Sequence, residues 1–384
     1  MVAAVRDGGS QRSVAQRFGV SLATVQLWLA RAGGRPLDAV DWYSRPPVAA
    51  RPGRTPADLE DLILETRRFL REESALGEYG AVAIRRALAE REDLPSPLPS
   101  VRTIGRILDR RGVLDAGRRV RRPAPPPGWY LPEVRERRTE LDSFDAIDGI
   151  HLMGGVDLDI LTGISLHGAL PAAWPVSGLR SGDVAASLLA HWRAFGRPAY
   201  GQFDNDARFV GGPSVPDSIG LVIRLLLAAG VVPVFTPPRS MGFQAAVEAF
   251  NGRWQRQVWA RFRMPTLADV EARNEAYLAA LRRRGAGRIE AAPPRLALAR
   301  GQVIDPRVPA TGRLVFIRRT GDAGGVTILN RPYPVDPYWV QRLVRVELDI
   351  DAHRIDVFAL RRREPTHQPL LAILPYTPPA RWFR

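Results

Sequence analysis

The chain has 384 residues and a formal net charge of +15 at pH 7. This length predicts two to four domains, and the charge favours a polyanionic partner, nucleic acid first and an anionic membrane surface second. The sequence contains no cysteine, which excludes disulfides and cysteine-type zinc sites. It has no apolar run of about 18 residues to cross a membrane and no N-terminus like a signal peptide, so we expect a cytoplasmic protein.

Stretches rich in proline, glycine and arginine divide the chain into four segments. Residues 32–56 have the composition of a linker, a second break follows Gly112, and a third lies at residues 291–294. We therefore expect four domains, at residues 1–31, 57–116, 137–290 and 300–384.

The first segment has the pattern of a DNA-binding helix-turn-helix. Ala15 is small enough to let two helices approach, Gly19 permits the unusual backbone of the turn, and Ser21 caps the second helix. The apolar positions that hold the two helices together are Val14, Phe18, Val25, Trp28 and Leu29. Thr24 and Gln26 then face outward, where a recognition helix meets the major groove. An ordinary helical hairpin is the alternative.

The second segment predicts three helices, near residues 57–73, 80–92 and 100–114, so it is a second helix-turn-helix-like domain. In the last helix Ser100 is the cap, and three arginines spaced four residues apart, Arg102, Arg106 and Arg110, line the face opposite its apolar residues. No acidic residue lies within this stripe. Four more arginines follow in the linker: Arg118, Arg119, Arg121 and Arg122. We expect Arg102, Arg106 and the linker arginines to contact DNA phosphates, and a merely solvated face is the alternative.

The third segment alternates between strand and helix patterns. Strands are predicted at residues 143–152, 157–166 and 168–176, a helix at 181–196, a strand at 198–206, a helix near 217–229, a strand at 231–237 and a helix at about 244–261. Turns separate the first three strands, which predicts an antiparallel meander. This order of elements is that of the ribonuclease H-like fold, so we expect an α/β core of this kind.

Three acidic residues stand in short motifs of this core. Asp145 lies on the opening strand, within residues 143–147. Asp204 follows the fourth strand, within residues 203–209, and Glu248 lies on the last helix, at the end of residues 242–248. On these motifs, residues 137–262 resemble the catalytic core of the DDE integrases and transposases related to retroviral integrases. The flanking domains also fit this family, which often has helix-turn-helix domains before the core and a small β-barrel after it.

The resemblance implies that Asp145, Asp204 and Glu248 are the catalytic residues and the ligands of two Mg²⁺ or Mn²⁺ ions. Asp145 would bridge the ions, and the other two acids would each hold one. Two such ions can activate an attacking oxygen and stabilise a leaving oxygen in phosphodiester chemistry. The nucleophile would be water in cleavage and a DNA 3′-hydroxyl in joining.

The sequence departs from the family pattern around these acids. Asp206 stands where the family usually has glycine, and this extra carboxylate is expected to alter the metal site or the local turn. Asp148 lies three residues after Asp145 on the opposite side of the strand, and it is the alternative first acid. Asn251 and Gln255 share the helix face of Glu248, where they either touch DNA or cap the rim of the site.

The last segment predicts five short strand stretches, at residues 313–320, 325–335, 342–351, 354–360 and 370–376. We expect a small barrel of the SH3-like kind. Its arginines Arg318, Arg319 and Arg361 to Arg363 would contact DNA without sequence preference, or the barrel is a protein-interaction module. The histidines show no metal-ligand spacing, and we expect His151, His167 and His191 to be structural or surface residues.

Together these patterns predict a transposase or integrase of the bacterial insertion-sequence type. It would bind the ends of its element, nick them and join them to target DNA. The expected partners are double-stranded DNA, further copies of the chain assembled on DNA, and an accessory ATPase. A non-catalytic regulator derived from a transposase is one alternative, against which the three retained acids argue. A structure-specific nuclease is another, but two helix-turn-helix-like segments better suit recognition of terminal repeats.

Overall fold

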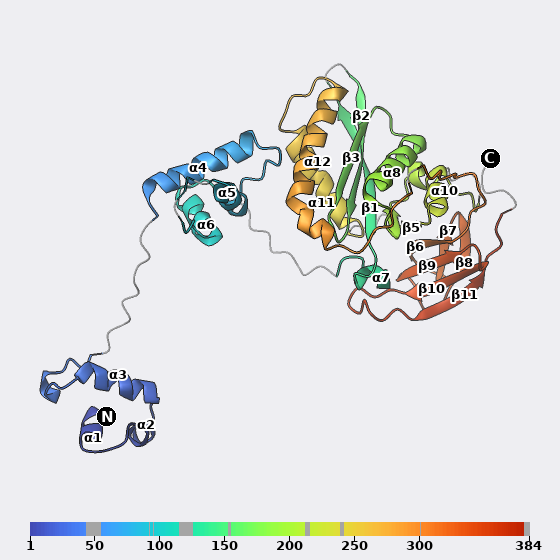
Figure 1. Ribbon diagram of the computed structural model, residues 1–384. Helices are drawn as coiled ribbons and strands as arrows, with labels where there is room; N and C mark the ends of the chain where they lie inside the picture. Colours follow the sequence, from blue (N-terminus) through green and yellow to red (C-terminus); the bar gives the residue numbers. More distant parts are fainter. Residues whose placement is uncertain are drawn as a thin grey trace. The chain divides into compact units, whose positions relative to one another are not determined.

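The computed structural model describes residues 1–43, 55–91, 93–94, 96–114, 126–152, 155–211, 216–238, 242–299 and 301–379. The chain forms two compact units, Met1–Pro56 and Ala57–Arg384 (Figure 1). Residues 44–54 of the predicted linker lie outside the described residues, as do Arg118, Arg119, Arg121 and Arg122. No helix among the described residues is long and apolar enough to span a membrane.

The first unit consists of short helices, with α1 at Val2–Arg6, α2 at Gln11–Phe18, α3 at Leu22–Ala32 and a 3-10 turn at Leu37–Ala39. Gly19 ends α2 with a φ of 63°, and the Ser21 hydroxyl accepts a hydrogen bond from the Thr24 amide at 3.1 Å. Both features are as predicted. Gln26 is exposed, whereas the Thr24 hydroxyl is 2.8 Å from that of Ser21 and takes part in the cap.

The second unit begins with three helices, α4 at Ala57–Glu72, α5 at Ala81–Ala89 and α6 at Val101–Arg110. They enclose a small apolar core made of Ile63, Ile84, Leu88, Ile104, Ile107 and Leu108. Ser100 caps α6 as predicted, and Arg102 and Arg106 are exposed. Arg110 differs, because it forms an ion pair with the buried Glu60 of α4. That partner lies outside the stripe, so the periodicity of α6 alone did not indicate it.

The remaining residues form a mixed α/β structure around one large sheet. Among the described residues nine strands follow the order β11-β10-β9-β6-β5-β4-β1-β2-β3. The predicted meander is β1 at Leu141–His151, β2 at Asp157–Ser165 and β3 at Pro171–Val176, paired antiparallel. Two parallel neighbours follow on the other side of β1, β4 at Tyr200–Phe203 and β5 at Val232–Phe235.

Helices cover both faces of the central strands. Leu161 of β2 packs in a core with α8 at Ser181–Phe195, α9 at Ala207–Val210 and α10 at Leu221–Ala228. Its neighbour Ile160 points to the opposite face, because side chains alternate along a strand. There it packs with α11 at Ala245–Trp254, its π-helical continuation Gln255–Trp259, and the long helix α12 at Leu267–Glu290. The sheet thus lies between two helical layers.

A third apolar core forms where the segment before β1 packs against the sheet. The short helix α7 at Pro132–Arg135 and the residues just before it bury Trp129, Tyr130 and Leu131 against β1, β4, β5 and β6. This packing fixes the entry of the chain into β1, the strand that carries Asp145.

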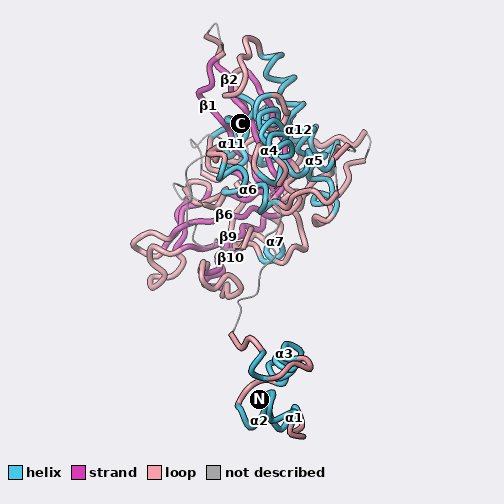
Figure 2. Tube along the Cα trace, turned by 90° about the vertical axis from the view of Figure 1, so that its left-hand side faces the viewer, coloured by secondary structure: helices cyan, strands magenta, loops and turns pink. Residues whose placement is uncertain are grey.

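The C-terminal strands are β6 at Arg313–Arg319, β7 at Gly325–Ile328, β8 at Arg331–Pro334, β9 at Leu343–Asp349, β10 at Arg354–Ala359 and β11 at Leu370–Pro375. The separate small barrel is not confirmed. Instead β6 pairs with β5 in parallel, and β9, β10 and β11 extend the same sheet (Figure 1, Figure 2). Alternating apolar residues predict strands, but they do not specify that the open edge of β5 accepts β6. The β7–β8 hairpin turns through Leu329 and Asn330, both with positive φ.

A buried ion pair links the start of β1 to the segment after α12. Both Arg295 Nη atoms lie 2.7 Å from the carboxylate oxygens of Asp142. His191 of α8 is buried beside this pair, with its Nε2 3.9 Å from Asp142. Burial lowers the pKa of His191 to about 4, although the charge of Asp142 opposes that effect. His191 is therefore a neutral core residue, as its lack of ligand spacing suggested.

We expect His191 to make the folded state sensitive to acid. Below a pH of about 6.5 the unfolded chain protonates this histidine, but the folded chain keeps it neutral down to a pH of about 4. Stability contributed by the neutral form is therefore lost as pH falls through this window, by roughly 2–3 kcal/mol in all. His191→Gln should flatten the fall in unfolding free energy between pH 7 and 4, as measured by urea denaturation. The exposed His367→Gln is the control, and equal slopes in all three proteins would contradict the expectation.

Candidate active site

The parallel pairing of β1 with β4 brings Asp145 and Asp204 together. Ser143 is paired with Gln202, and each acid lies two residues further along its own strand direction. Neighbouring strands are about 4.8 Å apart, and equivalent positions on them project to the same face. That face is covered by α11, whose first turn carries the exposed Glu248. The three acids that the sequence singled out therefore come from two adjacent strands and the helix packed over them.

Asn251 of α11 holds the Asp145 carboxylate in place. Its Nδ2 donates to Asp145 Oδ2 at 2.8 Å, and its Oδ1 accepts from the Thr162 hydroxyl at 2.6 Å. Thr162 is the cross-strand partner of Asp145 on β2, and its hydroxyl also lies 3.0 Å from the Asp145 carbonyl oxygen. The Ala146 amide donates to the other carboxylate oxygen at 3.0 Å. Asn251 thus positions Asp145, whereas Gln255 on the next turn is exposed.

The carboxylates of the site destabilise one another's charge. The pKa of Asp145 rises to about 6, through burial first and then through the charges of Asp204 and Glu248, while the hydrogen bonds from Ala146 and Asn251 oppose the rise. Burial also raises the pKa of Asp204, and the nearby carboxylate of Asp206 adds to this effect. Acids held close together against their mutual repulsion are suited to bind a cation.

The donor set fits a magnesium or manganese ion, because it consists of hard carboxylate oxygens. The acids do not surround a single point, however. Within the described ranges, no group of three or more acidic or histidine side chains lies close enough to hold one ion. If two ions are bound, each ion needs only some of the three carboxylates. The three carboxylates can then lie further apart than they could around a single ion.

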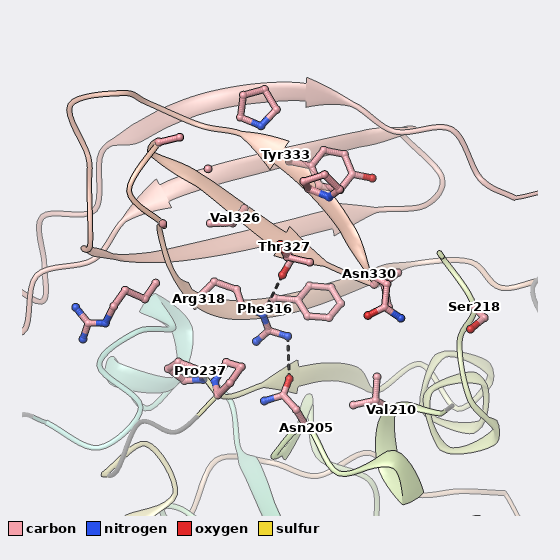
Figure 3. A pocket seen from close by; sticks show the side chains of 18 of the residues that line it. Asn205, Val210, Ser218, Pro237, Phe316, Arg318, Val326, Thr327, Asn330 and Tyr333 are labelled. Atoms are coloured by element: carbon pink, nitrogen blue, oxygen red, sulfur yellow. Dashed lines mark hydrogen bonds between the residues drawn. The ribbon is translucent and has the colours of Figure 1, made fainter. Parts of the chain in front are cut away.

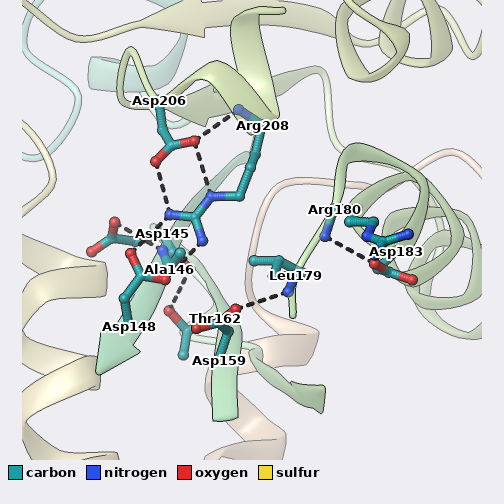
Figure 4. A network of polar contacts seen from close by, with 10 residues as sticks. All are labelled: Asp145, Ala146, Asp148, Asp159, Thr162, Leu179, Arg180, Asp183, Asp206 and Arg208. Carbon is teal, nitrogen blue, oxygen red and sulfur yellow. Dashed lines mark hydrogen bonds and ion pairs between the residues drawn. The ribbon is translucent and has the colours of Figure 1, made fainter. Parts of the chain in front are cut away.

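Arg208 separates the remaining two carboxylates from this set. Its guanidinium donates to both oxygens of Asp148, at 2.7 and 2.9 Å, and to both oxygens of Asp206, at 2.9 and 2.8 Å (Figure 4). Asp148 reaches Arg208 because β1 bulges between Ile147 and Ile150 and because it lies on the opposite side from Asp145. The two aspartates therefore have different partners. Asp148 is paired with Arg208, and Asp145 accepts a hydrogen bond from the side-chain amide of Asn251.

Asp206 stabilises the turn after β4. Its Oδ1 accepts from the Arg208 amide at 2.7 Å as the N-cap of α9, and its own amide donates to Asp204 Oδ1 at 2.9 Å. Hydrogen bonds from Arg208 lower the pKa of Asp206 and keep it ionised. The carboxylate that replaces the expected glycine thus serves as a helix cap and an ion-pair partner.

The side chain of Arg318 is directed at the residues after β4 and β5, which the sequence did not predict. Its Nη2 donates to Asn205 Oδ1 at 2.9 Å, and its Nη1 donates to the Thr236 carbonyl oxygen at 3.0 Å. Burial lowers the pKa of Arg318 to about 10, so that it remains charged at neutral pH. The expectation that Arg318 contacts DNA is therefore corrected, because protein oxygens occupy its guanidinium. Arg319 and the residues Arg361 to Arg363 are exposed.

Sequence reasoning missed Thr162, Arg208 and the role of Arg318. The contacts with Asp145, Asp148 and Asn205 join residues that are 17, 60 and 113 positions apart along the chain. The one local signal was the pair Asp206 and Arg208, since an aspartate before a short helix is a common cap.

Comparisons with known proteins give only distant likenesses. No protein-family model matches the chain, and no curated protein matches it. The simian T-cell lymphotropic virus intasome in complex with the PP2A regulatory subunit B56 gamma contains a chain that is 11% identical, with a TM-score of 0.35, over 70% of this chain and 88% of that one. The magnesium-bound HTLV-2 integrase catalytic core is 12% identical, with a TM-score of 0.28, over 36% of this chain and 82% of that one. The BIV integrase catalytic core is 18% identical, with a TM-score of 0.29, over 38% and 84%. At these scores the likenesses carry no argument about function.

We expect Arg208 and Asp206 to be energetically coupled. Arg208→Gln leaves Asp148 and Asp206 unpaired beside Asp204, which should lower the free energy of unfolding by roughly 1–2 kcal/mol. The expected loss is modest because the Asp148 side chain is 56% exposed and solvent screens its charge. Adding Asp206→Asn should recover part of the loss, since one repelling charge is gone. Urea denaturation in EDTA measures the cycle, with the exposed Arg193→Gln as control. Strictly additive effects of the two substitutions would show that the ion pair does not stabilise the site.

Proposed function

We propose that the chain is a metal-dependent enzyme that cuts and joins DNA, a DDE-type transposase or integrase with a ribonuclease H-like core. The observation that carries the proposal is the convergence of Asp145, Asp204 and Glu248 from adjacent parallel strands and the helix above them. The strand order β5-β4-β1-β2-β3 supports it, because this is the order that a ribonuclease H-like core requires. The net charge of +15 agrees with a nucleic acid substrate.

In this proposal Asp145, Asp204 and Glu248 would hold two Mg²⁺ or Mn²⁺ ions. Bound ions of this kind activate an attacking oxygen and stabilise the leaving oxygen of a phosphodiester. The protein supplies the geometry: Asn251 and the Ala146 amide fix both oxygens of Asp145. Arg208 holds Asp148 and Asp206 apart from the ions, so that these acids do not compete for them.

DNA contacts are assigned to the basic helical parts. Gln26 and Thr24 on α3 would read the ends of the element, and Arg102 and Arg106 on α6 would bind phosphates. The exposure of Gln26, Arg102 and Arg106 supports these roles, whereas the cap contact of Thr24 leaves its methyl group as the better candidate for a base contact. Two DNA ends must be joined, so we propose that several copies of the chain assemble on DNA, with an accessory ATPase as a further partner.

Conservative substitutions test the acids directly. Asp145→Asn, Asp204→Asn and Glu248→Gln keep shape but remove the charge that holds a divalent ion, so each should abolish nicking and strand transfer, a loss of at least about 100-fold. Binding of the DNA should persist, because a repelling charge near phosphate is lost. The matched control Asp148→Asn should keep most activity. The assay is cleavage and joining of labelled DNA with Mg²⁺ or Mn²⁺. An active Glu248→Gln protein would refute the assignment, and a wild-type protein that binds DNA without ever cutting it would favour a regulator.

The N-terminal unit and α6 should contribute differently to DNA binding. Deleting residues 1–56, a compact unit by itself, should abolish a sequence-specific footprint and leave salt-sensitive binding. Replacing Arg102 and Arg106 with alanine should weaken binding to all sequences alike and lower the salt slope by about 1 per lost contact. Footprinting measures the effect of the deletion, and salt titration of binding measures the effect of the two alanine substitutions.

A footprint that survives the deletion of residues 1–56 would place sequence recognition elsewhere in the chain.

A further inference from the structure

A large pocket lies beside the turn that carries Asp204. It has a volume of about 990 Å³ and opens between the β7–β8 hairpin on one side and the residues after β4 on the other (Figure 3). Phe316 and Arg318 of β6 line it together with Asn205, the residue after Asp204. Its size is at the upper end of the range of about 300–1,000 Å³ that is typical of small-molecule sites.

The chemistry of the pocket suits an anionic ligand with a flat apolar part. Of the described residues that line it, Arg318 and Arg319 are basic and none is acidic. This is notable because Asp204 and Asp206 lie on the adjoining turn. Val326 and Tyr333 supply apolar surface from the hairpin. Because Arg319 is exposed and the described lining carries no acid, the pocket attracts phosphate, and aromatic and aliphatic side chains bind a base by stacking and contact.

Polar groups that recognise base edges are also present. The side chains of Thr327 and Asn330 reach into the space from the hairpin, and that of Ser218 approaches it from the opposite side (Figure 3). Hydroxyl and amide groups both donate and accept hydrogen bonds, which is what the edge of a nucleobase requires. Paired bases are stacked within a duplex, so only an unpaired nucleotide can enter a pocket of this kind.

Hydrogen bonds of Asn205 connect the pocket to the turn that carries Asp204. Asn205 donates to the Thr236 carbonyl oxygen at 2.7 Å and accepts from Arg318 at 2.9 Å. One residue therefore links Asp204 to the end of β5 and to the β6 wall of the pocket. The wall of the pocket therefore begins one residue after a carboxylate of the candidate active site.

We propose that this pocket binds one unpaired nucleotide of the DNA substrate, next to the phosphodiester that reacts. The inference rests on the proposed function, because it identifies the form of DNA that the same site takes. It implies that local unpairing of the DNA is part of substrate recognition.

Binding to three labelled duplexes tests the proposal, using the full chain in EDTA and fluorescence anisotropy. The probes carry a single unpaired adenine, an abasic site at the same place, or no interruption. The wild type should prefer the unpaired adenine to the abasic site by about 5- to 10-fold, from base stacking in the pocket. Equal affinity for these two probes would overturn the proposal.

Two substitutions locate the preference. Thr327→Trp fills the pocket from an exposed hairpin position and should abolish the preference while leaving affinity for the paired duplex unchanged. Asn330→Asp keeps a residue that tolerates the positive φ of the turn and removes the side-chain amide donor that a base edge would meet, so it should lower the preference even if the larger substitution misfolds. The control is Val303→Trp, at a position that is 83% exposed and does not line the pocket. A preference that survives both pocket variants would overturn the proposal.

Separate measurements distinguish failure of the inference from failure of the proposed function. Nicking with Mg²⁺ reports on the acids, whereas adenine preference in EDTA reports on the pocket alone. If the wild type prefers the unpaired adenine but never nicks DNA, the inference about the pocket is supported and the proposed enzymatic function is wrong. If it nicks without any adenine preference, the pocket inference fails. A change in oligomeric state on Thr327→Trp, seen by light scattering with DNA preference intact, would assign the pocket to a second copy of the chain instead.

Discussion

The parallel register of β1 with β4 is the constraint on which the candidate active site depends. Because Ser143 pairs with Gln202, the two aspartates that follow at equal distance project from neighbouring strands to one face of the sheet. A slip of one residue would turn Asp204 to the face opposite Asp145. The aromatic packing of Phe144 on Phe203, with ring centroids 5.3 Å apart, supports this register from the other face. The position of the acids therefore depends on apolar packing behind them.

Charge balance is the second requirement of the site. Five carboxylates lie on β1, the turn after β4 and α11: Asp145, Asp148, Asp204, Asp206 and Glu248. Arg208 pairs with two of them through a set of short hydrogen bonds, and the charges of Asp204 and Glu248 raise the pKa of Asp145. Asn251 and Thr162 then orient Asp145 without adding charge. Arg208 thus pairs with the two carboxylates for which no cation is proposed.

Local patterns predicted the elements well, and pairings between distant elements much less. The helix caps at Ser21 and Ser100, the meander and the strand after which Asp204 follows were all readable, because they depend on residues a few positions apart. The pairing of β6 with β5 could not be predicted from the sequence. Nothing in the residues of β6 indicates which open strand edge it will pair with. Alternation along β1 correctly placed Asp145 and Asp148 on opposite sides. The residue that distinguishes them, Arg208, lies 60 positions away from Asp148, and no periodicity indicated it.

Locating a bound metal ion would test the assignment of Asp145, Asp204 and Glu248 directly. Crystals of the protein soaked in Mn²⁺ would reveal the ion by its anomalous scattering. We expect anomalous peaks at coordination distance from Asp145 and Asp204, with Glu248 completing the ligands, and no peak between Asp148 and Asp206 because Arg208 occupies that position. A peak held by Asp148 and Asp206, or the absence of any peak at Asp145 and Asp204 at saturating Mn²⁺, would contradict this assignment.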